Sequence, residues 1–193
     1  MKENPASLWS PDEETKKNSN LAVFCKNLDR KKLLKYSEDS KIFYHGFGED
    51  FISKNNLYDY NESDINVIKI NSPNGRFESE YMFELLLGGG PLDYTPEELQ
   101  KYITLIKQKP TIIIANLSRP TILTEIDYSA SAIIADFGSE DDIIKDLIHG
   151  RFNPSGKLPF EIPSSMDSVL NQKEDLPDDS LNPTYEYGYG ISY

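Results

Sequence analysis

The stretch TPEELQKYITLIKQKPTIIIAN, residues 95–116, holds the clearest structural signals in the chain. Thr95 has the residue type of a helix N-cap, a proline follows in the first turn, and Glu98 completes a capping box. Apolar residues then recur at helical spacing, which predicts one buried helix face. Pro110 ends this helix. The run TIIIAN (Thr111–Asn116) that follows is typical of a parallel strand covered by helices on both sides.

The same alternation of strand and helix continues on both sides of this stretch. SAIIADF (residues 131–137) predicts another strand, and SEDD (residues 139–142) predicts the capped start of a helix that ends near Gly150. Upstream, KIFYHGF (residues 41–47) and INVIKI (residues 65–70) have the composition of core strands. We therefore expect an α/β fold: a three-layer sandwich with a mostly parallel, flavodoxin-like sheet and helices on both faces.

The 193 residues suit one domain with appended arms. Residues 1–20 are polar and are expected to form an entry arm or interdomain linker. Residues 21–170 are expected to form the α/β sandwich domain. Residues 171–193 lack helix signals and end in alternating aromatics and glycines, which predicts an extended C-terminal tail packed on the domain.

Charge and composition exclude several classes of partner. The net charge of -12, from 32 acidic and 20 basic residues, would repel nucleic acid. The longest apolar runs are far shorter than the ~20 residues of a membrane span, and the N-terminus lacks the apolar core of a signal peptide. We therefore expect a cytoplasmic protein with no membrane partner. Cys25 is the single cysteine, and its apolar neighbours predict a buried thiol in a reducing compartment.

The glycine-rich and acidic motifs do not predict a cofactor. LLLGGGP (residues 85–91) lacks the lysine and hydroxyl residue of a phosphate loop, so a plain turn is expected. The acidic residues of DFGSEDD (residues 136–142) suit a helix cap and first turn. His45 and His149 have no partner at metal-binding spacing, so both are expected to be structural or surface residues. We expect neither a metal nor a cofactor.

Two motifs near the C-terminus indicate a family. NPSGKLP (residues 153–159), preceded by a strand and a helix, and YEYGYGISY (residues 185–193) together closely resemble the C-terminal α/β domain of glycoside hydrolase family 3, the β-glucosidase-like enzymes. TIIIANLSRPTIL (residues 111–123) looks like a strand and short connection of that domain. LAVFCKN (residues 21–27) is similar to a helix of the family that is rich in leucine and lysine. The resemblance covers nearly the whole chain but only one half of a family enzyme.

The resemblance implies how such a domain takes part in catalysis. Enzymes of this kind are retaining glycosidases, which use one carboxylate as nucleophile and another as acid/base. In the family, the aspartate nucleophile lies in a TIM-type barrel, which we expect this chain to lack. The second domain supplies the glutamate acid/base in many members. By position, this glutamate should follow the INVIKI strand, where Glu78 is the first candidate and Glu80 the alternative; both could also be solvated loop residues.

Three functions are compatible with these features. The first is the second domain of a β-glucosidase-like enzyme, which hydrolyses O-glycosidic bonds in carbohydrate metabolism only together with a nucleophile-bearing barrel that this chain lacks, and which is inactive alone. A family 3 barrel domain on another chain is a possible partner. The ligand would be a β-glycoside or a monosaccharide. The alternative is a non-catalytic sugar-binding or partner-docking module, with Tyr185, Tyr187 and Tyr189 in the docking patch. The third is an unrelated flavodoxin-like domain that binds a flavin or a phosphate.

The proline-rich strip FNPSGKLPFEIPSSM (residues 152–166) is expected to be structural. Its prolines disfavour a long helix or a central strand. Asn153–Gly156 predicts a turn, with the glycine free to take a positive φ. Beyond it, apolar and charged residues alternate as in an extended segment that is buried on one side. The expected inward residues are Leu158, Phe160 and Ile162, and the expected outward residues are Lys157 and Glu161.

Overall fold

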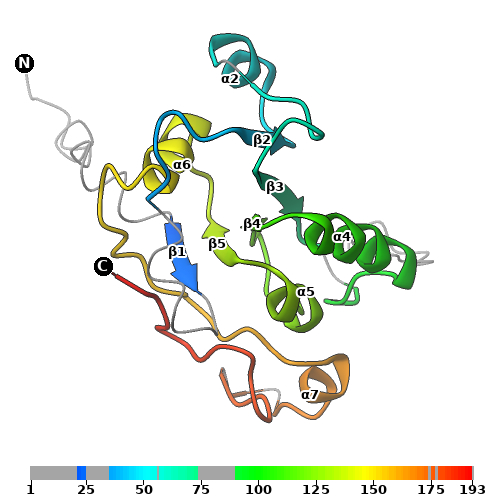
Figure 1. Cartoon of the computed structure of the whole chain (residues 1–193). Coiled ribbons are helices and arrows are strands. Elements are labelled where there is room, and N and C mark those ends of the chain that lie inside the picture. Colours follow the sequence, from blue (N-terminus) through cyan, green and yellow to red (C-terminus); the bar gives the residue numbers. More distant parts are fainter. Residues whose placement is uncertain are drawn as a thin grey trace, which may run out of the picture.

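The computed structural model describes residues 21–24, 35–55, 57–73, 90–173, 175–176 and 178–192. Within this part, five strands form one sheet in the order β1-β5-β4-β3-β2 (Figure 1). Strands β2 to β5 are parallel to one another, whereas β1 pairs antiparallel with β5. The predicted mostly parallel sheet is confirmed. The strand bounds are β1 Leu21–Phe24, β2 Ile42–His45, β3 Ile65–Asn71, β4 Thr111–Asn116 and β5 Ala132–Asp136.

Helices cover both faces of the sheet, as expected for a three-layer sandwich (Figure 1). Helices α4 (Pro96–Gln108) and α5 (Thr124–Ser129) pack on one face, where they join a buried cluster with residues 158–162 of the strip. Helices α2 (Glu49–Lys54) and α6 (Asp141–Ile148) contribute to the cluster on the other face. A fifth short helix, α7 (Met166–Leu170), follows the strip. In the described part of the chain, no helix is long and apolar enough to cross a membrane.

The central strands and helix α4 form where local sequence predicts them. β4 is buried over its first five residues, because helices shield both of its faces. At the start of α4, the Thr95 side chain accepts a hydrogen bond from the Glu98 amide, and the Glu98 carboxylate accepts one from the Thr95 amide. The predicted capping box is confirmed.

Two local expectations at the sheet edge and at α6 are wrong. Residues 21–24, which resemble a helix of the family, form strand β1, and all four are buried. Four apolar residues in a row suit a buried strand as well as a helix, and pairing with β5 decides between them. The expected cap at residues 139–142 is also absent, because the N-cap of α6 is Glu140 and its side chain makes no capping hydrogen bond. Cys25 and residues 1–20 lie outside the described residues.

The C-terminal tail runs beside the proline-rich strip and beside β1 (Figure 1). The Leu158 amide donates to the Tyr189 carbonyl at 2.9 Å, and the Ile162 amide donates to the Tyr185 carbonyl at 2.8 Å. Further along, the Ile191 amide donates to the Val23 carbonyl of β1 at 2.8 Å. The tail therefore links the strip to the edge of the sheet.

Gly156 has a different role from the one expected. It does not take a positive φ; the described glycines that do are Gly46, Gly90, Gly138, Gly150 and Gly188. A Cβ added to Gly156 would overlap the carbonyl oxygen of Leu21 in β1, and a Cβ added to Gly190 would overlap the carbonyl oxygen of Gly156. Close packing of three backbone segments explains both glycines.

Glu161 faces inward, which corrects the expected alternation of the strip. Leu158 and Ile162 are buried and Phe160 is half-buried, as predicted, but Glu161 is only 7% exposed. One oxygen of its carboxylate accepts hydrogen bonds from the Ser180 amide at 2.7 Å and from Gln172 Nε2 at 2.9 Å. These donors come from the segment after α7, which folds over the strip and satisfies the buried charge.

Candidate functional site

The carboxyl ends of the parallel strands form the edge of the sheet where α/β domains usually bind ligands. The register places Asn71 of β3 beside Asn116 of β4, and Asn116 beside Asp136 of β5. Both asparagines are exposed, whereas Asp136 is buried. Residues 74–89, which carry Glu78 and Glu80, follow β3 at this edge. They lie outside the described residues, but the residues on either side of them are described.

The departure of the segment from β3 is fixed by Ser72. This side chain is buried, and its hydroxyl lies 3.0 Å from the Asn116 carbonyl and 3.2 Å from the Arg119 carbonyl. The Ser72 amide also donates to the Asn116 carbonyl at 3.1 Å. Thr121, which is fully buried, donates to the Ser72 hydroxyl at 2.9 Å. The chain therefore leaves β3 tied to the β4–α5 connection.

The return of the segment is fixed by Arg119. Its guanidinium donates to the carbonyl oxygens of Gly90 and Pro91, with 2.8 Å to the latter. Burial lowers the pKa of the Arg119 guanidinium, but an arginine stays charged at neutral pH. The Tyr94 hydroxyl donates to the Asn71 carbonyl at 2.9 Å, so the chain that follows Pro91 is also hydrogen-bonded to the end of β3. The described residues on either side of segment 74–89, Ser72 on one side and Gly90 and Pro91 on the other, are thus both tied to the β4–α5 connection.

Elsewhere at this edge, Asp141 at the start of α6 connects β3 to the residue before α2. One of its oxygens lies 2.5 Å from Lys69 Nζ of β3, and the other accepts a hydrogen bond from the Gly48 amide at 2.8 Å. The Asp136 carboxylate accepts hydrogen bonds from the amides of Gly138 and Ser139. An open hollow of about 620 Å³ adjoins Asp141. Its lining includes the carboxylates of Glu49, Asp50, Glu140 and Asp142, so its field disfavours a phosphate.

The tyrosines predicted to form a docking patch separate into buried and exposed residues. Tyr185 is 4% exposed, its ring packs 4.7 Å from that of Phe24, and its hydroxyl donates to Asp127 at 2.6 Å. Including Tyr185 in the patch was therefore wrong, because the tail uses this side chain to fill the core. Tyr187 is 64% exposed and Tyr189 36% exposed, so both remain at the surface.

The two histidines, His45 and His149, lie on different elements. His45 ends β2 and is exposed, and His149 follows α6 with its Nδ1 2.9 Å from the Tyr36 carbonyl. Among the described residues, no group of three His, Cys, Asp or Glu side chains is placed to hold a metal ion.

Sequence reasoning missed the residues that hold the segment. Ser72, Thr121 and Arg119 are ordinary loop residues in the sequence, and their hydrogen bonds join positions 29 to 49 residues apart. The available signal was their position after the strand ends of β3 and β4, where parallel strands bring loops together.

The fold defines a class: an α/β domain with a mostly parallel sheet and helices on both of its faces. The model of the glycosyl hydrolase family 3 C-terminal domain matches residues 15–193. This chain belongs to that family.

Sequence and structure comparisons agree with the family match. The chain is 34% identical over 168 residues to beta-glucosidase C of Emericella nidulans, which covers 83% of the chain and 26% of that protein. It is 28% identical to the periplasmic beta-glucosidase/beta-xylosidase of Dickeya chrysanthemi, covering 86% of the chain and 26% of that protein. The beta-glucosidase from Listeria innocua, solved with isofagomine, has the same fold, with a TM-score of 0.62 at 16% identity over 90% of the chain and 32% of that structure. The chain therefore spans about a quarter of the length of these curated relatives.

Proposed function

We propose that this domain contributes segment 74–89 to the active site of a β-glycosidase whose nucleophile lies in a TIM-type barrel. The observation that carries the proposal is the hydrogen bonding of the residues on either side of the segment to the β4–α5 connection, by Ser72 and by Arg119. A loop held at both ends can present a side chain to a neighbouring domain at a defined position, which catalysis requires. The match to the family supports the reaction class.

Within this segment, Glu78 is proposed as the acid/base and Glu80 as the alternative. In a retaining mechanism, the acid/base donates a proton to the leaving glycosidic oxygen while the nucleophile attacks the anomeric carbon. It then removes a proton from the water that hydrolyses the glycosyl-enzyme. Because the reaction needs two carboxylates about 5–5.5 Å apart, the domain is proposed to be inactive alone and to require a barrel, on another chain or joined to this one.

The test combines the chain with the barrel domain of a family relative and measures hydrolysis of two aryl β-glucosides, one with a poor and one with a good leaving group. Glu78→Gln should lower the rate about 10²–10⁴-fold on the poor leaving group, as loss of a general acid does. The loss should be much smaller on the good leaving group, which needs no proton. Added azide should then speed turnover, because it needs no base to attack the intermediate.

The matched variants are Glu80→Gln and Glu62→Gln, the latter at an exposed position before β3. Both should behave like the unaltered chain. If Glu80→Gln shows the pattern instead, the role moves to Glu80. Unchanged rates for both segment variants would contradict the proposal, and turnover by the chain alone that depends on Glu78 would contradict the need for a barrel.

A further inference from the structure

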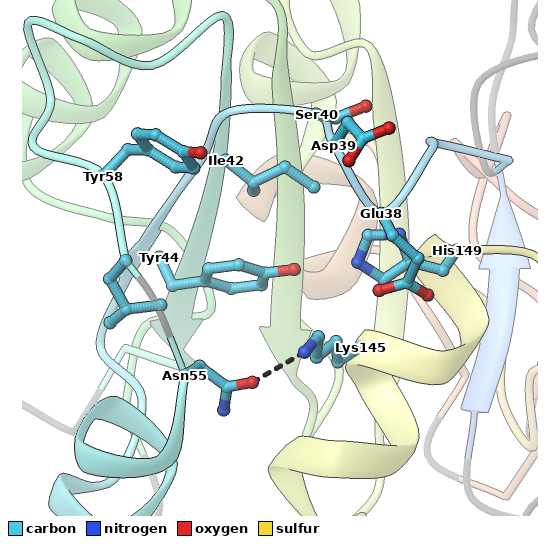
Figure 2. Close-up of a pocket in the computed structure, with 10 residues that line it drawn as sticks. Glu38, Asp39, Ser40, Ile42, Tyr44, Asn55, Tyr58, Lys145 and His149 are labelled. Carbon is cyan, nitrogen blue, oxygen red and sulfur yellow. Dashed lines mark hydrogen bonds between the residues drawn. The ribbon is translucent and has the colours of Figure 1, made fainter.

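A separate hollow lies at the amino end of β2, beside Ile42. Residues 38–40 precede β2, and His149 follows α6, which begins after the carboxyl end of β5 and runs back along the sheet. The Tyr36 amide donates to the Ile148 carbonyl at 3.2 Å, which brings these two segments together. Between them and the end of α2 is a cavity of about 360 Å³ (Figure 2). Ligand pockets usually measure about 300–1,000 Å³.

Tyr44 of β2 places an unsatisfied hydroxyl in the wall of this cavity. The side chain is 8% exposed, and its ring packs against Phe47 and Phe51. Within the described part of the chain, the buried hydroxyl has no hydrogen-bond partner. It points toward the side where Lys145, His149 and Glu38 lie (Figure 2). Buried polar groups almost always have hydrogen-bond partners. We therefore expect the partner of this hydroxyl to be a group outside the described part of the protein.

Burial also favours the protonated form of that hydroxyl. Desolvation raises the pKa of Tyr44 above its ordinary value, and the charge of Glu38 acts in the same direction. A tyrosine is already protonated at neutral pH, and the raised pKa extends this form to higher pH, so the hydroxyl can donate as well as accept a hydrogen bond.

Three charged side chains line the cavity: Glu38, Asp39 and Lys145. Glu38 lies 2.5 Å from the guanidinium of Arg151. Lys145 Nζ donates to Asn55 Oδ1 at 2.6 Å. Asp39 is exposed, and when Arg151 is included two cations lie near two carboxylates, so neither sign of charge dominates at the cavity.

His149 adds an acceptor to this wall. Its Nδ1 faces the Tyr36 carbonyl, which can only accept, so a proton is assigned to Nδ1; in the tautomer with this one ring proton, Nε2 is an acceptor. The rest of the lining combines the polar side chains of Asp39 and Ser40 with the apolar or aromatic side chains of Ile42, Leu57 and Tyr58. Donors, acceptors and ring faces around one cavity suit a small molecule that has hydroxyl groups on a carbon skeleton.

We propose that this cavity binds a small uncharged polyol of monosaccharide size and that the Tyr44 hydroxyl is one of its hydrogen-bonding partners. The site is distinct from the carboxyl edge of the sheet and does not depend on a barrel. Binding of a polyol can therefore be tested separately from the proposed catalytic role. It gives the non-catalytic sugar-binding alternative a defined place in the fold.

The test uses the 193-residue chain alone, with calorimetric titration and ligand-observed NMR of glucose and myo-inositol as probes. At least one of the two should bind. Tyr44→Phe removes a single oxygen that has no described partner, so it should weaken this binding tenfold or more while leaving the melting temperature unchanged or higher. Tyr187→Phe, at an exposed position of the tail, is the control and should bind normally.

The same titrations with glycine and inorganic phosphate test charged ligands. Binding of either one without binding of glucose or myo-inositol would overturn the assignment to an uncharged ligand. Binding of a polyol that is equally tight in Tyr44→Phe would overturn the placement of the site, and failure of both polyols to bind at millimolar concentration would overturn the proposal itself.

Discussion

At the scale of the residue, two glycines explain why the family motifs have the form they do. Gly156 of NPSGKLP lies against the backbone of β1, and Gly190 of the closing motif lies against Gly156. In neither case does the reason lie in a left-handed conformation, since neither residue takes a positive φ. The two glycines are 34 positions apart in the sequence, and close contact between their backbones leaves no room for a side chain at either one.

Gly156→Ala should therefore be strongly destabilising. The added methyl group would overlap the Leu21 carbonyl, which is backbone and cannot swing away, and overpacking of this kind costs about 1–3 kcal/mol or more. Urea unfolding followed by circular dichroism measures the change in the free energy of unfolding.

Gly48→Ala is the matched control for this substitution. Gly48 has φ -66°, and the atom that its new methyl group would meet is the end of the flexible Asp141 side chain at 3.3 Å. Its free energy of unfolding should stay within about 0.5 kcal/mol of the unaltered chain. Equal effects of the two substitutions would show that the contact with β1 is not what fixes Gly156.

At the scale of the element, helix α4 forms from signals that are all local. The capping box satisfies amides that no intrahelical carbonyl can reach. The hydroxyl of Thr95 accepts from the Glu98 amide at 3.1 Å, and the Glu98 carboxylate accepts from the Thr95 amide at 2.9 Å. The start of this helix is thus determined by residues within one turn of it.

Thr95→Ala should lower the free energy of unfolding by about 1 kcal/mol, the usual effect of losing such a cap. Thr104→Ala tests the same change of residue type inside the same helix, where the threonine is exposed and its hydroxyl donates to the Gln100 carbonyl and accepts from Gln100 Nε2. Alanine has the higher helix propensity, so this control should be neutral or slightly stabilising. Thermal unfolding of both variants provides the comparison, and a smaller loss for Thr95→Ala than for Thr104→Ala would refute the capping role.

Elements with strong local patterns could be predicted, and those that depend on distant contacts could not. β4 has the predicted bounds, because a β-branched run after a proline admits few other structures. β1 was misassigned, since its four apolar residues become a strand only through pairing with β5. Helices α2, α5 and α7 have five or six residues, too few to show a helical period.

The candidate site follows the same division. The position of segment 74–89 after β3 could be predicted, because it depends only on the order of strands in the chain. Its anchors could not, because Ser72 and Arg119 act on partners that lie far away in the sequence. The burial of Glu161 was missed for the same reason, since its donor Ser180 lies 19 residues further along.

At the scale of the whole molecule, the last residues of the chain hold the antiparallel edge of the sheet in place. Tyr185 fills the core beside Phe24 of β1. The carbonyls of Tyr185 and Tyr189 accept the amides of Ile162 and Leu158, and the Ile191 amide donates to β1. The tail, the strip and β1 therefore form one structural unit, although they come from opposite ends of the sequence.

Deleting residues 184–193 should accordingly destabilise the whole domain. Loss of a buried aromatic side chain alone costs about 3–5 kcal/mol, and the deletion also removes the acceptors of two strip amides. We expect a large fall in the urea midpoint, with loss of hydrogen-exchange protection at the amides of Leu158 and Ile162.

Tyr187→Ser distinguishes this effect from a general sensitivity of the tail to change. Tyr187 is 64% exposed and lies between the two tyrosines whose carbonyls bind the strip. Its substitution should change the free energy of unfolding by no more than about 0.5 kcal/mol, as is usual for surface positions, and should leave both strip amides protected. If the deletion kept the midpoint and the protection of Leu158 and Ile162, the tail would be an appendage, and β1 would hold to β5 through strand pairing alone.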